Sequence, residues 1–156
     1  METVLSRIKT HSPAETEEAG ETVARYLLEK EKNGAFCAMY GDLGAGKTAF
    51  VRGAARVIAP GEAVQSPTYT VVNEYEGKNG LLLHFDMYRI DDADSLDSIG
   101  YWDYFDRGGY LFVEWSEKIP DALPDRFYII RIEKDPENED EREITFLYQD
   151  GEGENA

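Results

Sequence analysis

The segment from residue 41 to residue 48 restricts the possible folds of this chain more than any other feature. Its spacing is G-x-x-x-x-G-K-T, and its residues are Gly41, Asp42, Leu43, Gly44, Ala45, Gly46, Lys47 and Thr48. The glycines let successive backbone N–H groups turn inward around an anion, and a helix that follows adds the positive end of its dipole. Lys47 can then reach the β- and γ-phosphates, and the Thr48 hydroxyl can bind Mg²⁺. The segment predicts a phosphate-binding loop for a nucleoside triphosphate.

Both neighbours of the loop have the character that such a loop requires. Residues 35–40 form a short, mostly apolar run that is typical of a buried strand, and residues 49–58 carry apolar side chains at helical spacing. A glycine-rich turn that carries a lysine by coincidence would lack this context. We therefore expect an α/β protein with a P-loop NTPase-like fold, in which the loop joins a strand to its helix.

Capping residues define the elements before the loop. A first strand is expected over residues 3–9. A helix follows, with Ser12 as its N-cap, Pro13 at the first helical position and Glu15 completing a capping box. Asn and Gly residues end this helix near residue 32.

The second half of the chain is predicted to be mainly strands. Residues 69–86 form a β-hairpin, with a turn over residues 76–80. The further expected elements are a short helix at 91–99, a buried strand at 110–114, and two antiparallel strands at 126–133 and 143–148.

At 156 residues the chain is long enough for one domain with a sizeable core. Residues 1–149 are expected to form a single three-layer α/β domain with a mixed, mainly parallel sheet, and residues 150–156 a disordered acidic tail. No run approaches the ~20 apolar residues that cross a bilayer. The N-terminus has no secretory signal, so we expect a cytoplasmic protein without a membrane anchor. The single cysteine, Cys37, is expected to pack in the core.

The net charge restricts the partners of the protein. The chain has 32 acidic residues against 16 basic ones, a formal net charge of −16 at pH 7, and no cluster of Lys and Arg. Proteins that bind nucleic acid by themselves usually carry a basic surface. Direct binding to tRNA or DNA is therefore not expected, although such a surface would attract a basic partner protein. Alternatively, the charge simply keeps a small protein in solution.

Two carboxylates stand at the ends of predicted strands, where a phosphate loop requires an acidic partner for Mg²⁺. Asp86 follows residues 81–85, and Glu114 follows residues 110–113. The spacing does not choose between them: one is expected to hold the metal or its waters, and the other to orient the attacking water. Thr68, in a proline-containing loop, is placed like a γ-phosphate sensor, or else it forms a turn.

Three further polar residues have two interpretations each. Arg52 and Arg89 either neutralise phosphate charge or form surface ion pairs. His84 alternates with apolar neighbours inside a predicted strand. It is therefore either a hydrogen-bonded structural residue or a partner of Asp86, and the sequence leaves these alternatives open.

Four motifs occur together in this chain. They are the loop at 41–48, Ser66-Pro67-Thr68-Tyr69, His84-Phe85-Asp86-Met87-Tyr88-Arg89 and Val113-Glu114-Trp115-Ser116-Glu117. In this order and at these separations, they resemble the small bacterial TsaE (YjeE/YdiB) family, the ATPase component of threonylcarbamoyladenosine modification of tRNA. The resemblance covers roughly residues 10–130. The loop alone is shared with hundreds of enzymes, whereas the four motifs together are highly specific.

The resemblance implies a function beyond what the residues show. Such proteins have a P-loop ATPase fold, bind ATP and Mg²⁺, hydrolyse ATP weakly alone, and work with the TsaB–TsaD pair. That assembly places a threonylcarbamoyl group on adenosine 37 of tRNAs reading ANN codons. The tRNA would be reached only through the partner complex. The long acidic C-terminus departs from the family pattern, which leaves its partner contacts undefined.

The resemblance also assigns roles to residues of the site. Lys47 would hold phosphates, and Thr48 and Glu114 would hold Mg²⁺. Asp86 would be an essential carboxylate near the metal, and Thr68 would belong to a switch segment. These assignments apply only to the positions that match the family motifs.

The outer parts of the site are assigned in the same way. Trp115 would neighbour the nucleotide, and residues 10–16, which include Ser12, would lie near the adenine. Two rival functions remain. One is an ATP-binding switch or scaffold with incidental hydrolysis. The other is a small-molecule kinase, which would need an arginine-rich lid that residues 90–125 lack.

Overall fold

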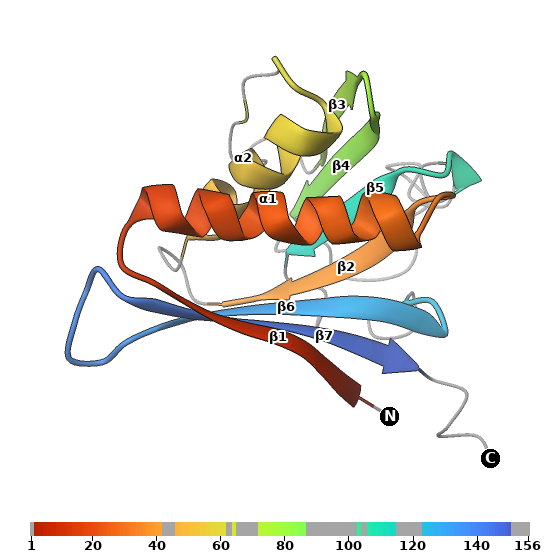
Figure 1. Cartoon of the computed structure of the whole chain (residues 1–156). Helices are drawn as coiled ribbons and strands as arrows, with labels where there is room; N and C mark the ends of the chain where they lie inside the picture. The colour runs from red at the N-terminus through yellow and green to blue at the C-terminus, as the bar shows by residue number, and fades with distance from the viewer. Residues whose placement is uncertain are drawn as a thin grey trace.

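The computed structural model describes residues 2–41, 46–61, 64, 72–86, 103, 106–114 and 123–150. Its strands are β1 (Glu2–Thr10), β2 (Ala35–Tyr40), β3 (Val72–Gly77), β4 (Gly80–Asp86), β5 (Tyr110–Glu114), β6 (Arg126–Lys134) and β7 (Arg142–Asp150). Its helices are α1 (Pro13–Lys30) and α2 (Lys47–Ile58). The strands form one sheet in the order β1-β7-β6-β2-β5-β4-β3 (Figure 1).

The strands in the middle of the sheet run parallel. β2 pairs with β5 on one side and with β6 on the other, and β4 pairs with β5, all in parallel. β3 is antiparallel to β4, and β7 is antiparallel to both β6 and β1. The predictions of a mixed α/β sheet with a parallel centre, and of an antiparallel hairpin, are confirmed.

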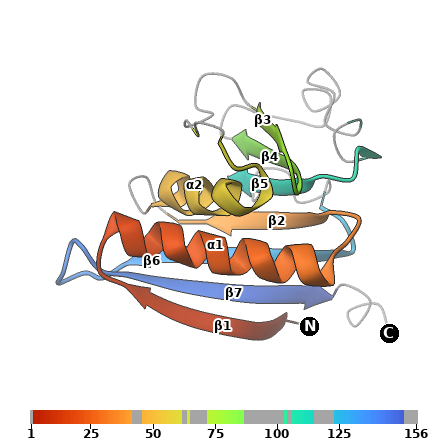
Figure 2. The ribbon, with the colours of Figure 1, turned by 45° about the horizontal axis from the view of Figure 1, so that its top comes forward.

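Both faces of the central strands are buried. Cys37 and Met39 of β2 belong to the core cluster that contains the helices, whereas Phe36 and Ala38 point to a second cluster on the opposite face. Figure 2 shows α1 and α2 side by side on the first face. The helix predicted at 91–99 lies outside the described residues, so the third layer of the predicted fold stays a prediction.

α1 begins where its capping residues predict. The Ser12 hydroxyl accepts a hydrogen bond from the backbone N–H of Glu15 at 3.2 Å, and Pro13 follows the cap. The Glu15 carboxylate accepts from the backbone N–H of His11 at 2.9 Å, one residue earlier than in the usual capping box. The helix ends at Lys30, slightly before the predicted residue 32, because the backbone has already left the helical conformation at the C-cap that follows.

The β3–β4 hairpin has a tighter turn than the sequence predicts. The strands pair as far as Gly77 and Gly80, so only Lys78 and Asn79 remain for the turn predicted over 76–80. The side-chain amide of Asn79 donates a hydrogen bond to the carbonyl oxygen of Val57 at 2.6 Å. The backbone N–H of Asn79 donates to the carbonyl oxygen of Ile58 at 3.1 Å. Because the last carbonyls of a helix have no partner within it, the turn caps the end of α2.

α1 and α2 cross at two glycines. A Cβ on Gly20 would lie 2.0 Å from the carbonyl oxygen of Phe50, and one on Gly53 would lie 1.8 Å from the carbonyl oxygen of Glu17. Side-chain carbon atoms do not approach backbone oxygens so closely, so the helix spacing requires glycine at both positions. The two helices therefore pack backbone to backbone.

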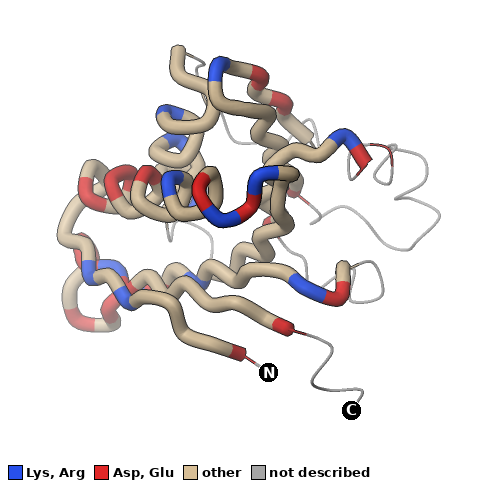
Figure 3. Tube along the Cα trace, turned by 45° about the vertical axis from the view of Figure 1, so that its right-hand side comes forward, with Lys and Arg blue, Asp and Glu red and all other residues tan. Residues whose placement is uncertain are grey.

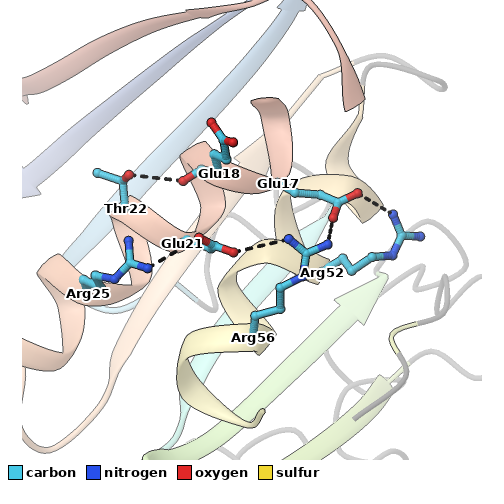
Figure 4. A network of polar contacts seen from close by, with 7 residues as sticks. All are labelled: Glu17, Glu18, Glu21, Thr22, Arg25, Arg52 and Arg56. Atoms are coloured by element: carbon cyan, nitrogen blue, oxygen red, sulfur yellow. Dashed lines mark hydrogen bonds and ion pairs between the residues drawn. The ribbon is translucent and has the colours of Figure 1, made fainter. Parts of the chain in front are cut away.

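Charged side chains connect the helices at the same crossing (Figure 4). Glu17 of α1 pairs with Arg52 at 3.4 Å and also with Arg56 of α2, and Glu21 reaches Arg56 at 3.2 Å. The arginines are about half exposed, so each pair contributes little stability. Arg52 is thus in a surface ion pair, which is one of its two interpretations.

Replacing Gly53 with alanine should destabilise the protein. Alanine favours a helix over glycine by ~0.5–1 kcal/mol, but its methyl group would force α1 and α2 apart, and overpacking typically costs ~1–3 kcal/mol or more. We expect the thermal midpoint, followed by circular dichroism, to fall by about 2–4 °C for each kcal/mol lost. The exposed helix variant Thr22→Ala is the control, with a change within ~0.5 kcal/mol. A Gly53→Ala midpoint equal to that of the wild type would contradict the required glycine contact.

Three other expectations concern the core and the chain ends. Cys37 is fully buried, and burial raises the pKa of its thiol, as expected for a core residue. β7 extends to Asp150, which pairs with Arg126, so the sheet includes the first residue of the predicted tail; residues 151–156 lie outside the described part. Of the helices that the structure describes, none is long and apolar enough to cross a membrane.

Candidate nucleotide-binding site

Ionisable groups from three elements meet at the carboxyl edge of the parallel strands. Lys47 begins α2, Glu114 ends β5, and His84 lies near the end of β4. The Lys47 ammonium is 3.5 Å from Oε1 of Glu114, and it donates a hydrogen bond to the carbonyl oxygen of Gly41 at 2.7 Å. His84 Nε2 forms a hydrogen bond with Oε2 of Glu114. Since β4 and β5 run parallel beside β2, their ends lie where ligands bind in open α/β sheets.

Gly46, the last glycine of the loop, has a left-handed backbone conformation. Gly46 has a φ of 106°, a backbone angle that residues with a Cβ rarely adopt. Its carbonyl oxygen accepts the first helical hydrogen bond, from the backbone N–H of Phe50 at 2.9 Å. Because Gly46 has no side chain, it cannot cap the N–H groups at the start of α2. The first N–H groups of a helix have no partner within it, and such a helix start favours an anion. Thr48 lies in this first turn and is half-buried.

Lys47 and Glu114 form a buried ion pair. Each is only 7% exposed. Burial alone would raise the pKa of Glu114, but the hydrogen bond and charge of His84 and the charge of Lys47 outweigh it, and the net pKa is below its ordinary value. Glu114 is therefore a carboxylate, and it is a hydrogen-bond acceptor at both oxygens.

Asp86 lies directly beside this pair. It is opposite Glu114 in the parallel register of β4 and β5, and it is half-buried. Residues that face each other across neighbouring strands point to the same side of the sheet. The two carboxylates that the sequence placed at strand ends are thus brought together.

The available donors fit Mg²⁺ held jointly with phosphates. Among the described residues, no group of three or more His, Cys, Asp or Glu side chains could hold a metal by itself. Mg²⁺ usually takes one or two carboxylates together with phosphate oxygens and waters. The hydroxyl of Thr48 and the carboxylates of Glu114 and Asp86 are oxygen donors of this kind.

A cavity of about 160 Å³ opens beside the start of α2. Its lining consists of Ser12, Pro13, Thr16, Gly46, Ala49, Asp140 and Arg142. Ser12, which the resemblance places near the adenine, is thus next to the last glycine of the loop. The turn between β6 and β7 is held against the end of β1 and the connection to α1, since Glu141 lies 3.2 Å from His11 and 3.5 Å from Lys9.

Sequence reasoning missed the contribution of the β6–β7 turn to this cavity. Asp140 and Arg142 belong to a polar acidic stretch, residues 133–142, that no motif distinguishes from any surface turn. They reach the cavity only because β6 and β7 extend from the side of β2 opposite to β5. A pairing between strands that distant in sequence leaves no local signal.

Several predicted site residues lie outside the described part of the chain. They are Asp42, Leu43, Gly44, Ala45, Thr68, Arg89 and Trp115. His84 is described, and its hydrogen bond goes to Glu114 on the neighbouring strand. This contact agrees with the first of its two interpretations, a hydrogen-bonded residue inside the sheet. The roles of the other residues stay predictions.

The chain is similar to bacterial proteins that share one name. A family model described as "Threonylcarbamoyl adenosine biosynthesis protein TsaE" matches residues 10–144. The tRNA threonylcarbamoyladenosine biosynthesis protein TsaE of Haemophilus influenzae is 36% identical over 137 residues, covering 87% of this chain and 85% of that protein. The protein of the same name from Bacillus subtilis is 36% identical over 138 residues, covering 88% and 82% respectively.

A solved structure has the same fold. The crystal structure of Bacillus subtilis YdiB matches with a TM-score of 0.73 at 32% sequence identity. The match covers 99% of this chain and 91% of that chain. The comparison of sequences and the comparison of structures therefore both find bacterial proteins with a similar sequence and the same fold.

Proposed function

Because the chain belongs to the TsaE family, we propose that it is a Mg²⁺-dependent ATPase required for threonylcarbamoyl modification of adenosine 37 in tRNAs reading ANN codons. It acts in the cytoplasm with the TsaB–TsaD complex, and it reaches tRNA only through that complex. Its own hydrolysis of ATP is slow, and the partners control it. The names of its relatives support the pathway, and the site geometry supports the chemistry.

The Lys47–Glu114 pair is the observation that carries this proposal. A buried ion pair adds little net stability, because both charges must be removed from water. A phosphate group offers Lys47 the same kind of negative partner that Glu114 offers. The pair lies at the strand edge, next to Gly46, where a helix N-terminus also favours an anion. Phosphate binding therefore explains why both charges are kept there.

The remaining roles follow from the position of each donor. Thr48 and Glu114 would hold Mg²⁺, which supplies positive charge against the phosphate oxygens. Asp86, beside Glu114, would orient the water that attacks the γ-phosphate. Ser12 and the cavity next to Gly46 would accommodate the base end of the nucleotide. Together these residues supply positioning and charge, on which phosphoryl transfer mainly depends.

The charge of the surface is consistent with a partner that carries the tRNA. Figure 3 shows Lys and Arg positions interspersed with Asp and Glu positions along α1 and around the turn between β6 and β7. With a formal net charge of −16, the chain would repel the phosphates of free tRNA.

The test combines two assays with purified components. ATP hydrolysis is measured for the chain alone, with TsaB–TsaD, and with EDTA, and threonylcarbamoylation of tRNA is followed over several turnovers. We expect slow Mg²⁺-dependent hydrolysis alone, a changed rate with the partners, and repeated modification only when ATP is hydrolysed. Modification that proceeds equally with a non-hydrolysable ATP analogue would favour the switch or scaffold function. If the chain changes neither assay, the pathway assignment fails.

A further inference from the structure

His84 is a fully buried histidine whose hydrogen bond is made to a functional carboxylate. Its side chain is 0% exposed, and its Nε2 is hydrogen-bonded to Oε2 of Glu114. In the sheet it lies between Asn73 of β3 and Phe112 of β5, two residue pairs before the pair formed by Asp86 and Glu114. A polar ring in such a position is costly to bury, so its interaction with Glu114 requires an explanation.

The contact determines which ring nitrogen of His84 carries a proton. An ionised carboxylate can only accept hydrogen bonds, so Nε2 of His84 must donate. Within the described part of the chain, Nδ1 is buried and has no hydrogen-bond partner. Among the described residues, the hydrogen bond to Glu114 is therefore the one that the imidazole makes.

Glu114 is held at both of its oxygens. Lys47 lies 3.5 Å from Oε1, and His84 donates to Oε2. Glutamate has several rotatable bonds, and fixing them costs conformational entropy unless neighbours hold the group. If bound phosphates attract the Lys47 ammonium away from Glu114, the hydrogen bond from His84 still holds the carboxylate. Its own position is fixed by the packed centre of the sheet and not by a loop.

We infer that His84 is a positioning residue that holds the Glu114 carboxylate in the orientation needed at the Mg²⁺–nucleotide site. The inference rests on the proposed ATPase function. His84 acts through Glu114 and touches neither ATP nor the metal. Partners that orient a metal-binding side chain typically change metal affinity or activity by about 10–100-fold when they are removed.

The test compares His84→Leu with His84→Gln. Leucine fills similar space without a donor, whereas the glutamine amide can donate to Glu114 much as Nε2 does. At saturating ATP, with TsaB–TsaD present, we expect the leucine variant to need about 10–100-fold more Mg²⁺ for half-maximal hydrolysis, or to lose a similar factor in kcat. The glutamine variant should recover most of this loss. Nucleotide binding in EDTA should stay within about twofold of the wild type for both, because the binding loop is untouched.

A second readout does not require activity. Imidazole ¹⁵N NMR of the wild-type protein without nucleotide should show a proton on Nε2 of His84, the nitrogen that is hydrogen-bonded to Glu114. Thermal midpoints of both variants, measured in parallel, identify any loss of folding. Because leucine also removes a buried polar atom, its midpoint should not fall far below that of the glutamine variant.

The outcomes separate the two proposals. Equal Mg²⁺ dependence and kcat in the leucine variant and the wild type would overturn the positioning role, as would equal impairment of both variants or an Nε2 that carries no proton. A wild-type protein that binds no ATP, or shows no Mg²⁺-dependent hydrolysis even with TsaB–TsaD, would instead overturn the proposed function. The inference about His84 would then fail with it.

Discussion

Replacing Lys47 with alanine should abolish ATP binding. The Lys47 ammonium is almost fully buried beside the loop, where it would make charge-assisted hydrogen bonds to two phosphate groups. Such bonds are worth ~1.5–3 kcal/mol each, so we expect the Kd to rise by about 100-fold or more. The measurement is isothermal titration calorimetry with ATP or ADP, with and without Mg²⁺.

The control for this prediction is the removal of another lysine. Lys78 lies exposed in the β3–β4 turn, so Lys78→Ala changes the net charge equally but should not change the Kd. Lys47→Ala also leaves Glu114 without its ion-pair partner, and Lys47→Met, which keeps the apolar stem, tests whether folding is affected. Unchanged ATP affinity in folded Lys47 variants would remove this residue from the phosphate site.

Replacing Glu114 with glutamine, or Asp86 with asparagine, should stop turnover and leave nucleotide binding. In the proposed site, the loop and Lys47 bind the phosphates and the cavity beside Gly46 accommodates the base, so nucleotide binding does not depend on either carboxylate. Because charge placement near the transferred phosphate contributes factors of about 100 or more, we expect kcat to fall by at least that amount in each variant. ATP affinity in EDTA should change by less than about threefold.

A titration with Mg²⁺ then assigns the two carboxylates. If Glu114 holds the metal, Glu114→Gln should raise the Mg²⁺ concentration needed for half-maximal hydrolysis, because an amide oxygen carries no charge. If Asp86 orients water, Asp86→Asn should lower kcat at unchanged Mg²⁺ dependence. Glu76→Gln, at an exposed position of β3, is the matched control. Full activity in both site variants would contradict their roles.

The features that the sequence predicts well are those with local causes. The apolar run at 35–40 and the G-x-x-x-x-G-K-T spacing predict a strand, a loop and then a helix over 49–58, and the structure has β2 at Ala35–Tyr40 and α2 at Lys47–Ile58. Ser12 and Pro13 define the start of α1, because a helix cap involves only neighbouring residues. The carboxylates Asp86 and Glu114 are found by their position after apolar runs, since a strand ends where its apolar pattern ends.

Features that depend on the order of strands could not be predicted in this way. Periodicity shows that His84 is inside a strand, but its partner is Glu114 because β5 lies next to β4 in parallel register. Gly53 looks like a weak point in a helical pattern, yet it is required by the carbonyl of Glu17, which is far away in sequence. The role of Arg142 beside the cavity likewise depends on where β7 lies in the sheet.

The pairing of β1 with β7 has a consequence for synthesis of the protein in the cell. Glu2 lies opposite Gln149, and Thr10 lies opposite Arg142. Among the described strands, β1 pairs with β7, so β1 cannot pair until β7 has been synthesised. Ribosomes extend the chain from its N-terminus at about 5–20 residues per second. During that time α1 and α2 can already pack against each other, while β1 keeps an exposed edge. The pairing of β1 therefore forms as one of the final events, after β7 leaves the exit tunnel, and a prematurely terminated chain would leave β1 without its partner strand and prone to aggregation.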